Sequence, residues 1–351
     1  MNVGQVITYA KEWVELYGSR IPGFRGAHLM GSILALPHDA PFPSYRDVDF
    51  NIVCEGAPDT ETHDVAYKGL ILEYSTVSTE RYRSPEDVLA NPELAANLAV
   101  DGILADPIGV LAPLQQAVAA QYAQRRWVLA RCGYEKQVVM QAIEGLRHAT
   151  EPAESLWLLS SCILFLSGLL AEACLRPPTH RRCLVLMGEV LHAQDRADLH
   201  ETALQLLGFA HLRRPQVEQY LRDCAEAFDR AVAVTRTPVP FQFKLQPHVR
   251  PYIIAGAQEM IDQGYHREAM FWIGGFLMFA NAAIQHDAPD AERPIFQAKY
   301  DRLVAELGIQ TPADVAMRLR DVDALATEIF AVADALIEQR PTLVAQEQLT
   351  C

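Results

Sequence analysis

The sequence predicts an α+β protein in which a small mixed-sheet core is followed by a larger all-helical domain. Up to about residue 114, helical stretches alternate with short apolar runs that are rich in β-formers and bounded by Gly and Pro. From Val110 onward, apolar residues recur at helical spacing almost without interruption. We therefore expect a core over 1–114, a helical domain over 115–340 and a polar tail over 341–351.

The core begins with an amphipathic helix over about residues 3–18, whose apolar positions are Val3, Ile7, Ala10, Val14 and Tyr17. A turn follows at Ile21-Pro22-Gly23. A short apolar run covers 27–30 and ends at Gly31-Ser32. We expect strands at 47–54, 67–77 and 102–106, and the second of these is especially rich in β-formers. Ser84 and Pro85 together predict the start of a helix over 84–89, since Ser caps helices and Pro fits the first turn.

In the helical half, the breaks between helical segments fall mainly at prolines. We expect helices near 110–131, 134–149, 154–175, 180–193, 198–208, 214–235, 250–263, 266–285, 294–306 and 312–338. Leu156 to Ala171 is apolar enough to raise the question of a membrane span. It covers only 16 residues and contains Ser160, Ser161 and Ser167, so we expect a buried helix and no membrane partner.

Composition narrows the class of partner and the compartment. The net charge of −14 argues against a nucleic-acid partner, because phosphate backbones are bound by clustered Lys and Arg. The seven cysteines are scattered and contain no C-x-x-C pair, which is typical of reduced thiols in the cytoplasm. The first residues follow a helical pattern with interspersed charges and do not resemble a signal peptide. The sequence does not predict an oligomeric state.

Two carboxylates lie one residue apart at the start of the strand expected over 47–54. Because successive side chains of a strand point to opposite faces, Asp47 and Asp49 share one face, and Val48 and Phe50 share the other. Two adjacent like charges repel unless a proton or a cation lies between them. A hard divalent ion such as Mg²⁺ relieves the repulsion and leaves room for phosphates, so the triplet is a candidate metal site.

Two further features strengthen the interpretation of the Asp-x-Asp triplet. Gly31-Ser32 ends an apolar run 15 residues before Asp47, and a turn there exposes backbone N–H groups and a hydroxyl that can cradle a polyphosphate. Glu73 is the lone charge in "LILEYSTV" (70–77), where it costs free energy unless it is paired or bound to metal. If the two strands are neighbours, the three carboxylates suit two-metal phosphoryl-type transfer.

These residues resemble the polymerase-β-type nucleotidyltransferase superfamily. The segment "ILADPIGVLAPL" (103–114) and the helical second half are similar to its aminoglycoside nucleotidyltransferase branch. The resemblance implies ATP or another NTP as donor, two Mg²⁺ ions, and transfer of a nucleoside monophosphate to a hydroxyl with release of pyrophosphate. It matches Gly31 and Ser32 to the phosphate-holding pair, and Asp47 and Asp49 to the metal ligands. Glu73 matches the third carboxylate, which in some members acts as the base.

We therefore predict a Mg²⁺-dependent nucleotidyltransferase, with AMP from ATP transferred to a small-molecule hydroxyl of aminoglycoside-like type. Catalysis and metal binding are expected at Asp47, Asp49 and Glu73, and nucleotide binding at Gly31, Ser32 and Arg46. Two alternatives remain open at this point. One is a non-catalytic nucleotide-binding or interaction protein that retains the fold, and the other is an AMPylating enzyme that modifies protein. Relatives can also place a base in the helical domain, where Glu144, Glu154 and Glu172 are candidates without distinction.

Overall fold

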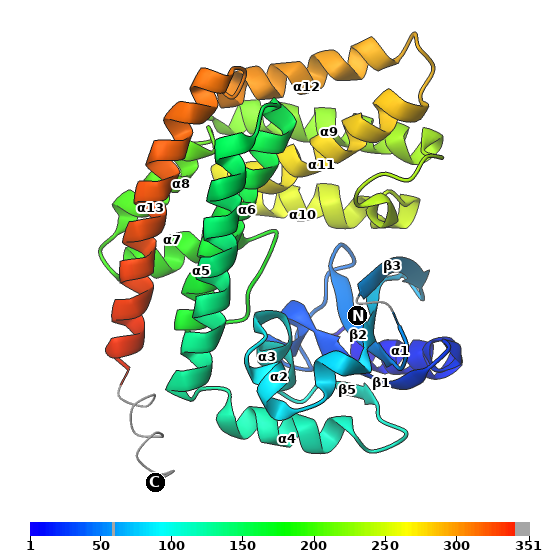
Figure 1. Ribbon diagram of the computed structural model, residues 1–351. Coiled ribbons are helices and arrows are strands. Elements are labelled where there is room, and N and C mark those ends of the chain that lie inside the picture. The colour runs from blue at the N-terminus through cyan, green and yellow to red at the C-terminus, as the bar shows by residue number, and fades with distance from the viewer. Residues whose placement is uncertain (58–59, 341–351) are drawn as a thin grey trace. The chain divides into compact units, whose positions relative to one another are not determined.

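The computed structural model describes residues 1–57 and 60–340 of the chain (Figure 1). By contacts it divides into two compact units. Unit 1 combines residues 1–134 with 172–178 and 336–340, and unit 2 combines residues 135–171 with 179–335. The domains expected over 1–114 and 115–340 remain a prediction, and the tail expected over 341–351 lies outside the described residues.

Unit 1 contains the sheet and the helices around it. Its strands are β1 (Phe24–Met30), β2 (Asp47–Cys54), β3 (Thr60–Tyr67), β4 (Leu70–Ser78) and β5 (Ile103–Ala105). Its helices are α1 (Val3–Leu16), α2 (Pro85–Leu89), α3 (Pro92–Leu98) and α4 (Leu111–Gln121). Ser84 caps α2 by accepting from the Asp87 N–H, as the sequence predicts.

The five strands form one mixed sheet in the order β3-β4-β2-β1-β5. β2 and β4 are parallel, and the other neighbouring strands are antiparallel. The single strand expected over 67–77 is wrong at its start: Lys68 and Gly69 form a turn between β3 and β4. Both turn residues have positive φ (49° and 78°), which suits the tight hairpin turns that match strand twist.

The two faces of the sheet are covered by different helices. On one face α1 packs against β2 and β4, and Val14, Phe50 and Leu72 belong to this core. On the other face Val53 and Val77, near the ends of β2 and β4, pack against α2, α3 and α4. Earlier in β2 and β4, the side chains on this second face are polar except for the buried Ile71, so the sheet offers a largely polar surface beside a packed core.

The remaining helices are mostly in unit 2, and the mixed α+β class expected from the sequence is confirmed. They are α5 (Arg125–His148), α6 (Pro152–Ala173), α7 (Cys183–Ala193), α8 (Ala197–Leu206), α9 (Arg214–Val234), α10 (Arg250–Asp262), α11 (His266–Asp287), α12 (Arg293–Leu307) and α13 (Pro312–Glu338). Within unit 2, α11 packs along α9 and α10. The helix expected over 110–131 is wrong as one element, because it is interrupted at 122–124 between α4 and α5.

One helix of the described residues, α6, is long and apolar enough to cross a membrane. In the most apolar window of this helix, 67% of the residues are buried inside the protein. The core helix of a globular protein can have the same length and apolarity, so these two properties are weak evidence for a membrane span.

Candidate functional site

The parallel pairing of β2 with β4 brings the three predicted carboxylates together. In this register Asp49 lies opposite Glu73, and Asp47 lies opposite Ile71. Paired residues of neighbouring strands point to the same face, so all three carboxylates emerge on the face away from α1. One carboxylate oxygen from each of Asp47, Asp49 and Glu73 lies within 4.8 Å of the others, and all three residues are half-buried.

The alternation of side chains along β2 determines which face of the sheet carries the two aspartates. Val48, Phe50 and Ile52 are buried on the α1 face, so a one-residue slip of β2 would expose them and bury the aspartates. Three negative charges at this spacing repel one another, and a divalent cation bound between them removes that cost. The oxygen-only donor set is the one that hard cations prefer, so the cluster is compatible with divalent metal binding.

The Gly31-Ser32 turn adjoins this cluster. Gly31 opens the 3₁₀ turn η2 (Gly31–Ala35) with a φ of 72°, a conformation that glycine adopts without strain. A Cβ atom on Gly31 would lie 2.6 Å from Asp49 Oδ2, so the turn is pressed directly against the second aspartate. The turn at the end of β1 and the carboxylates near the start of β2 therefore meet on one face of the sheet, as the sequence predicts.

The expectation that this turn exposes its N–H groups is wrong for Gly31. Its N–H donates to Oδ1 of Asn97 on α3 at 2.9 Å, so this amide is already used within the protein. Ser32 is exposed and keeps its side chain at the surface. Arg46 directly precedes β2 and is half-buried. The phosphate-binding roles of Ser32 and Arg46 remain predictions.

A fourth carboxylate was missed by the sequence analysis. Asp64 on β3 lies opposite Glu73 on β4, so the row Asp64, Glu73 and Asp49 crosses three adjacent strands on the same face. It was missed because β3 was not predicted. The β-forming residues Val65 and Tyr67, which lie directly before the Lys68-Gly69 turn, would have indicated this strand.

A buried hydrogen-bond network lies one pair further along the sheet. Asn51 on β2 lies opposite His28 on β1, and both side chains reach the Tyr82 hydroxyl, at 3.0 Å from Asn51 Nδ2 and 2.9 Å from His28 Nε2. His28 Nδ1 lies 3.0 Å from the Leu29 carbonyl and donates to it, so Nε2 accepts from Tyr82. Burial lowers the pKa of His28 to about 4 and raises the pKa of Tyr82. The network is thus satisfied with every member neutral.

The three glutamates considered as bases after residue 115 have other surroundings. Glu172 is fully buried and forms an ion pair with the equally buried Arg131 at 2.5 Å. Arg131 also donates to the Leu89 and Tyr122 carbonyls, so this pair ties three segments of unit 1 together. Glu144 is exposed and pairs with its helix neighbours Arg147 and His148, and Glu154 is exposed in the first turn of α6. Burial raises the pKa of Glu172.

Comparisons with known proteins leave the family open. No model of a known protein family matches the chain, and no curated protein matches its sequence. One similar solved structure is a nucleotidyltransferase-like protein from Exiguobacterium sibiricum 255-15. The match is 11% identical, covers 86% of this chain and 88% of that chain, and has a TM-score of 0.31. A likeness at this level carries no conclusion about activity, so the functional interpretation depends on the residues of the site.

Proposed function

We propose that the protein is a Mg²⁺-dependent nucleotidyltransferase that transfers a nucleoside monophosphate, AMP from ATP, to a hydroxyl of a small molecule. The observation that carries the proposal is the convergence of Asp47, Asp49 and Glu73 within 4.8 Å, with the Gly31 turn pressed against Asp49. Carboxylates at this spacing bind divalent cations, and a turn beside them is where the triphosphate of an NTP would lie.

The residues of the site would divide the chemistry as follows. Asp47 and Asp49 would hold the metal, which when bound would supply positive charge to the triphosphate and lower the pKa of the acceptor hydroxyl. Ser32 and Arg46 contact the phosphates. Glu73 would be the third ligand or the general base that accepts the proton of the attacking hydroxyl. The acceptor oxygen forms a bond to the α-phosphorus as the bond from that phosphorus to the β-phosphate oxygen breaks, and pyrophosphate leaves.

The acceptor and the compartment are the less constrained parts of the proposal. The net charge of −14 favours a cationic acceptor, which agrees with the aminoglycoside-like class implied by the sequence resemblance. Six cysteines of the described residues are free thiols, which supports a cytoplasmic setting.

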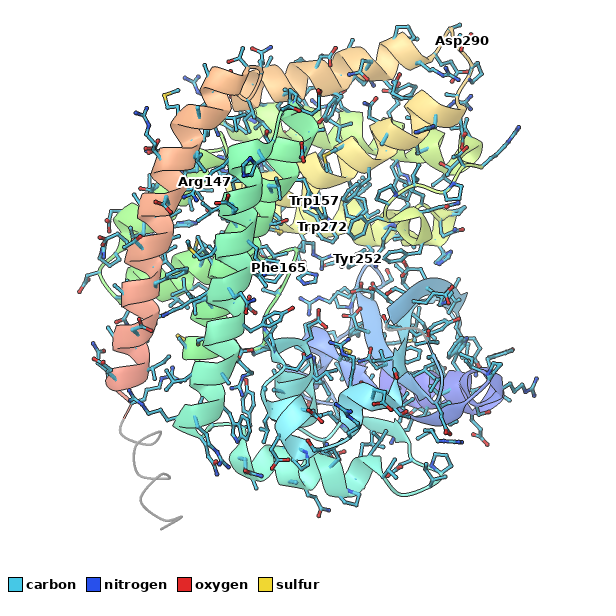
Figure 2. All side chains as sticks on the ribbon, viewed as in Figure 1. Arg147, Trp157, Phe165, Tyr252, Trp272 and Asp290 are labelled. Carbon is cyan, nitrogen blue, oxygen red and sulfur yellow. The ribbon has the colours of Figure 1, made fainter. Side chains whose placement is uncertain are left out.

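Pyrophosphate release tests the activity directly. The protein is incubated with each NTP, Mg²⁺ and a panel of hydroxylated acceptors that includes aminoglycosides. We expect Asp49→Asn to lower the rate of pyrophosphate release by about 10²–10⁴-fold. The control is Asp290, a highly exposed aspartate in unit 2 (Figure 2), and Asp290→Asn should leave the rate unchanged. Equal rates for Asp49→Asn and wild type would refute the proposal. Label from α-³²P-ATP on the protein fraction would instead indicate AMPylation, and nucleotide binding without turnover a non-catalytic protein.

A further inference from the structure

The Gly31 amide is held by a side chain from another element of unit 1. Asn97 on α3 is 7% exposed, and its Oδ1 accepts the Gly31 N–H at 2.9 Å. Its Nδ2 donates to the Glu93 carbonyl one turn earlier in the same helix. Because both ends of the amide are bonded, the orientation of the Asn97 side chain is fixed, and the acceptor oxygen points at Gly31.

The helix that carries Asn97 is itself firmly anchored. Asn91 caps α3 by accepting from the Glu93 and Leu94 N–H groups. Leu94 and Leu98 are buried in the core on this side of the sheet. Arg81, in the 3₁₀ turn η3 (Thr79–Tyr82), pairs with Glu93 at 2.8 Å. The oxygen that holds Gly31 is therefore presented by a rigid support, a requirement for any group that fixes a site to within a fraction of an ångström.

The turn that is held needs such a support. No side chain caps η2, and a glycine with a φ of 72° is conformationally permissive when nothing fixes it. Gly31 lies against Asp49, so rotation of its peptide would move the turn away from the carboxylates. Ile33, which is buried in the core, and Leu34, which contacts Gly102, secure the later part of the turn, whereas the bond from Asn97 holds the Gly31 amide at its start.

From these contacts we infer that Asn97 is a positioning residue, which holds the Gly31-Ser32 turn at the distance from Asp49 that a metal-bound triphosphate requires. The inference rests on the proposed function for the identity of the ligand. It assigns Asn97 no contact with substrate. The metal ligands themselves lie on β2 and β4, whose pairing does not involve Asn97. Loss of the hydrogen bond between Gly31 and Asn97 therefore weakens nucleotide binding and leaves the cluster of carboxylates intact.

The test uses two substitutions at Asn97 and one matched control. Asn97→Leu keeps the branched shape of the side chain and removes the acceptor, and Asn97→Asp keeps an oxygen that can accept the Gly31 N–H. Asn281→Leu removes an equally buried asparagine in unit 2, where its amide donates to Gln297 at 3.2 Å. Three quantities are measured on the full chain: amide hydrogen exchange at Gly31, Mn²⁺ affinity without nucleotide, and ATP affinity with Mg²⁺. The kcat and the KM for ATP are measured where turnover is found.

We expect Asn97→Leu to accelerate Gly31 exchange and weaken ATP binding about tenfold, with Mn²⁺ affinity unchanged and the effect in KM rather than kcat. Asn97→Asp restores exchange protection, and Asn281→Leu alters none of these quantities. Wild-type ATP affinity in Asn97→Leu, or an equal loss in Asn281→Leu, overturns the inference. If the wild-type protein binds no NTP, the proposed function fails. In that case unchanged amide exchange at Gly31 in Asn97→Leu shows separately that Asn97 does not hold the Gly31 turn. If Asn97→Leu does not fold, unprotected Gly31 in folded Asn97→Asp overturns it.

Discussion

Gly31→Ala places one methyl group between the turn and the proposed metal ligand. At a φ of 72° an alanine pays the cost of the left-handed conformation, about 1–2 kcal/mol. Its Cβ would also lie 2.6 Å from Asp49 Oδ2, well inside van der Waals contact. Because that oxygen is the end of a rotatable side chain, the carboxylate can swing aside at small cost. We therefore expect a modest loss of stability and a large loss of metal affinity.

Gly69→Ala provides the matched control. Gly69 has a φ of 78°, and nothing lies within 4 Å of the position that a Cβ atom would take there. An alanine at this position is therefore destabilised only by its left-handed backbone conformation. In urea denaturation both variants should lose about 1–2 kcal/mol of unfolding free energy. In a Mn²⁺ titration followed by electron paramagnetic resonance, Gly31→Ala should bind about 10- to 100-fold more weakly, and Gly69→Ala as wild type. Equal Mn²⁺ affinities for the two variants would refute the geometry proposed for Gly31 and Asp49.

Three further predictions concern buried polar groups of unit 1. Arg131→Met leaves Glu172 without its ion-pair partner and should cost about 3–5 kcal/mol in urea denaturation. The double variant with Glu172→Leu should recover most of this loss, and no recovery would contradict the pairing. His28 has a folded pKa of about 4, below its unfolded value near 6.5, so its contribution is complete above pH 6.5 and is lost as the pH falls. Unfolding free energy should drop by about 3 kcal/mol toward pH 4, and this drop should be absent in His28→Gln. Tyr82→Phe removes the hydroxyl shared by His28 and Asn51 and should cost about 1–3 kcal/mol in the same denaturation assay, and a smaller loss would contradict the network.

The local patterns that predict the site are short and nearly independent of context. Alternation along β2 placed Asp47 and Asp49 on one face, because side-chain direction in a strand has a period of two. The helical periodicity after residue 110 predicted most of the helices to within a few residues. The position of Glu73 among apolar neighbours showed that its charge needed a partner.

What the sequence alone could not decide was which segments lie side by side. That β2 pairs with β4 in parallel, with Asp49 opposite Glu73, depends on the packing of both strands against α1 and is not encoded in either strand by itself. The same holds for Asp64, which joins the row only through the β3–β4 hairpin. Asn97 is 66 residues from Gly31 in the chain, and only the folded structure of unit 1 brings its acceptor to that amide.

The sequence by itself determined the types of group available at the site: oxygen ligands, a glycine turn and a hydroxyl. Tertiary structure decided which groups meet and which are already used. Local preferences act over a few residues, whereas strand register and buried hydrogen bonds are set by the packing of segments distant in the chain. For this reason Glu172, one of three equivalent candidates in the sequence, is the buried partner of Arg131 in the folded protein.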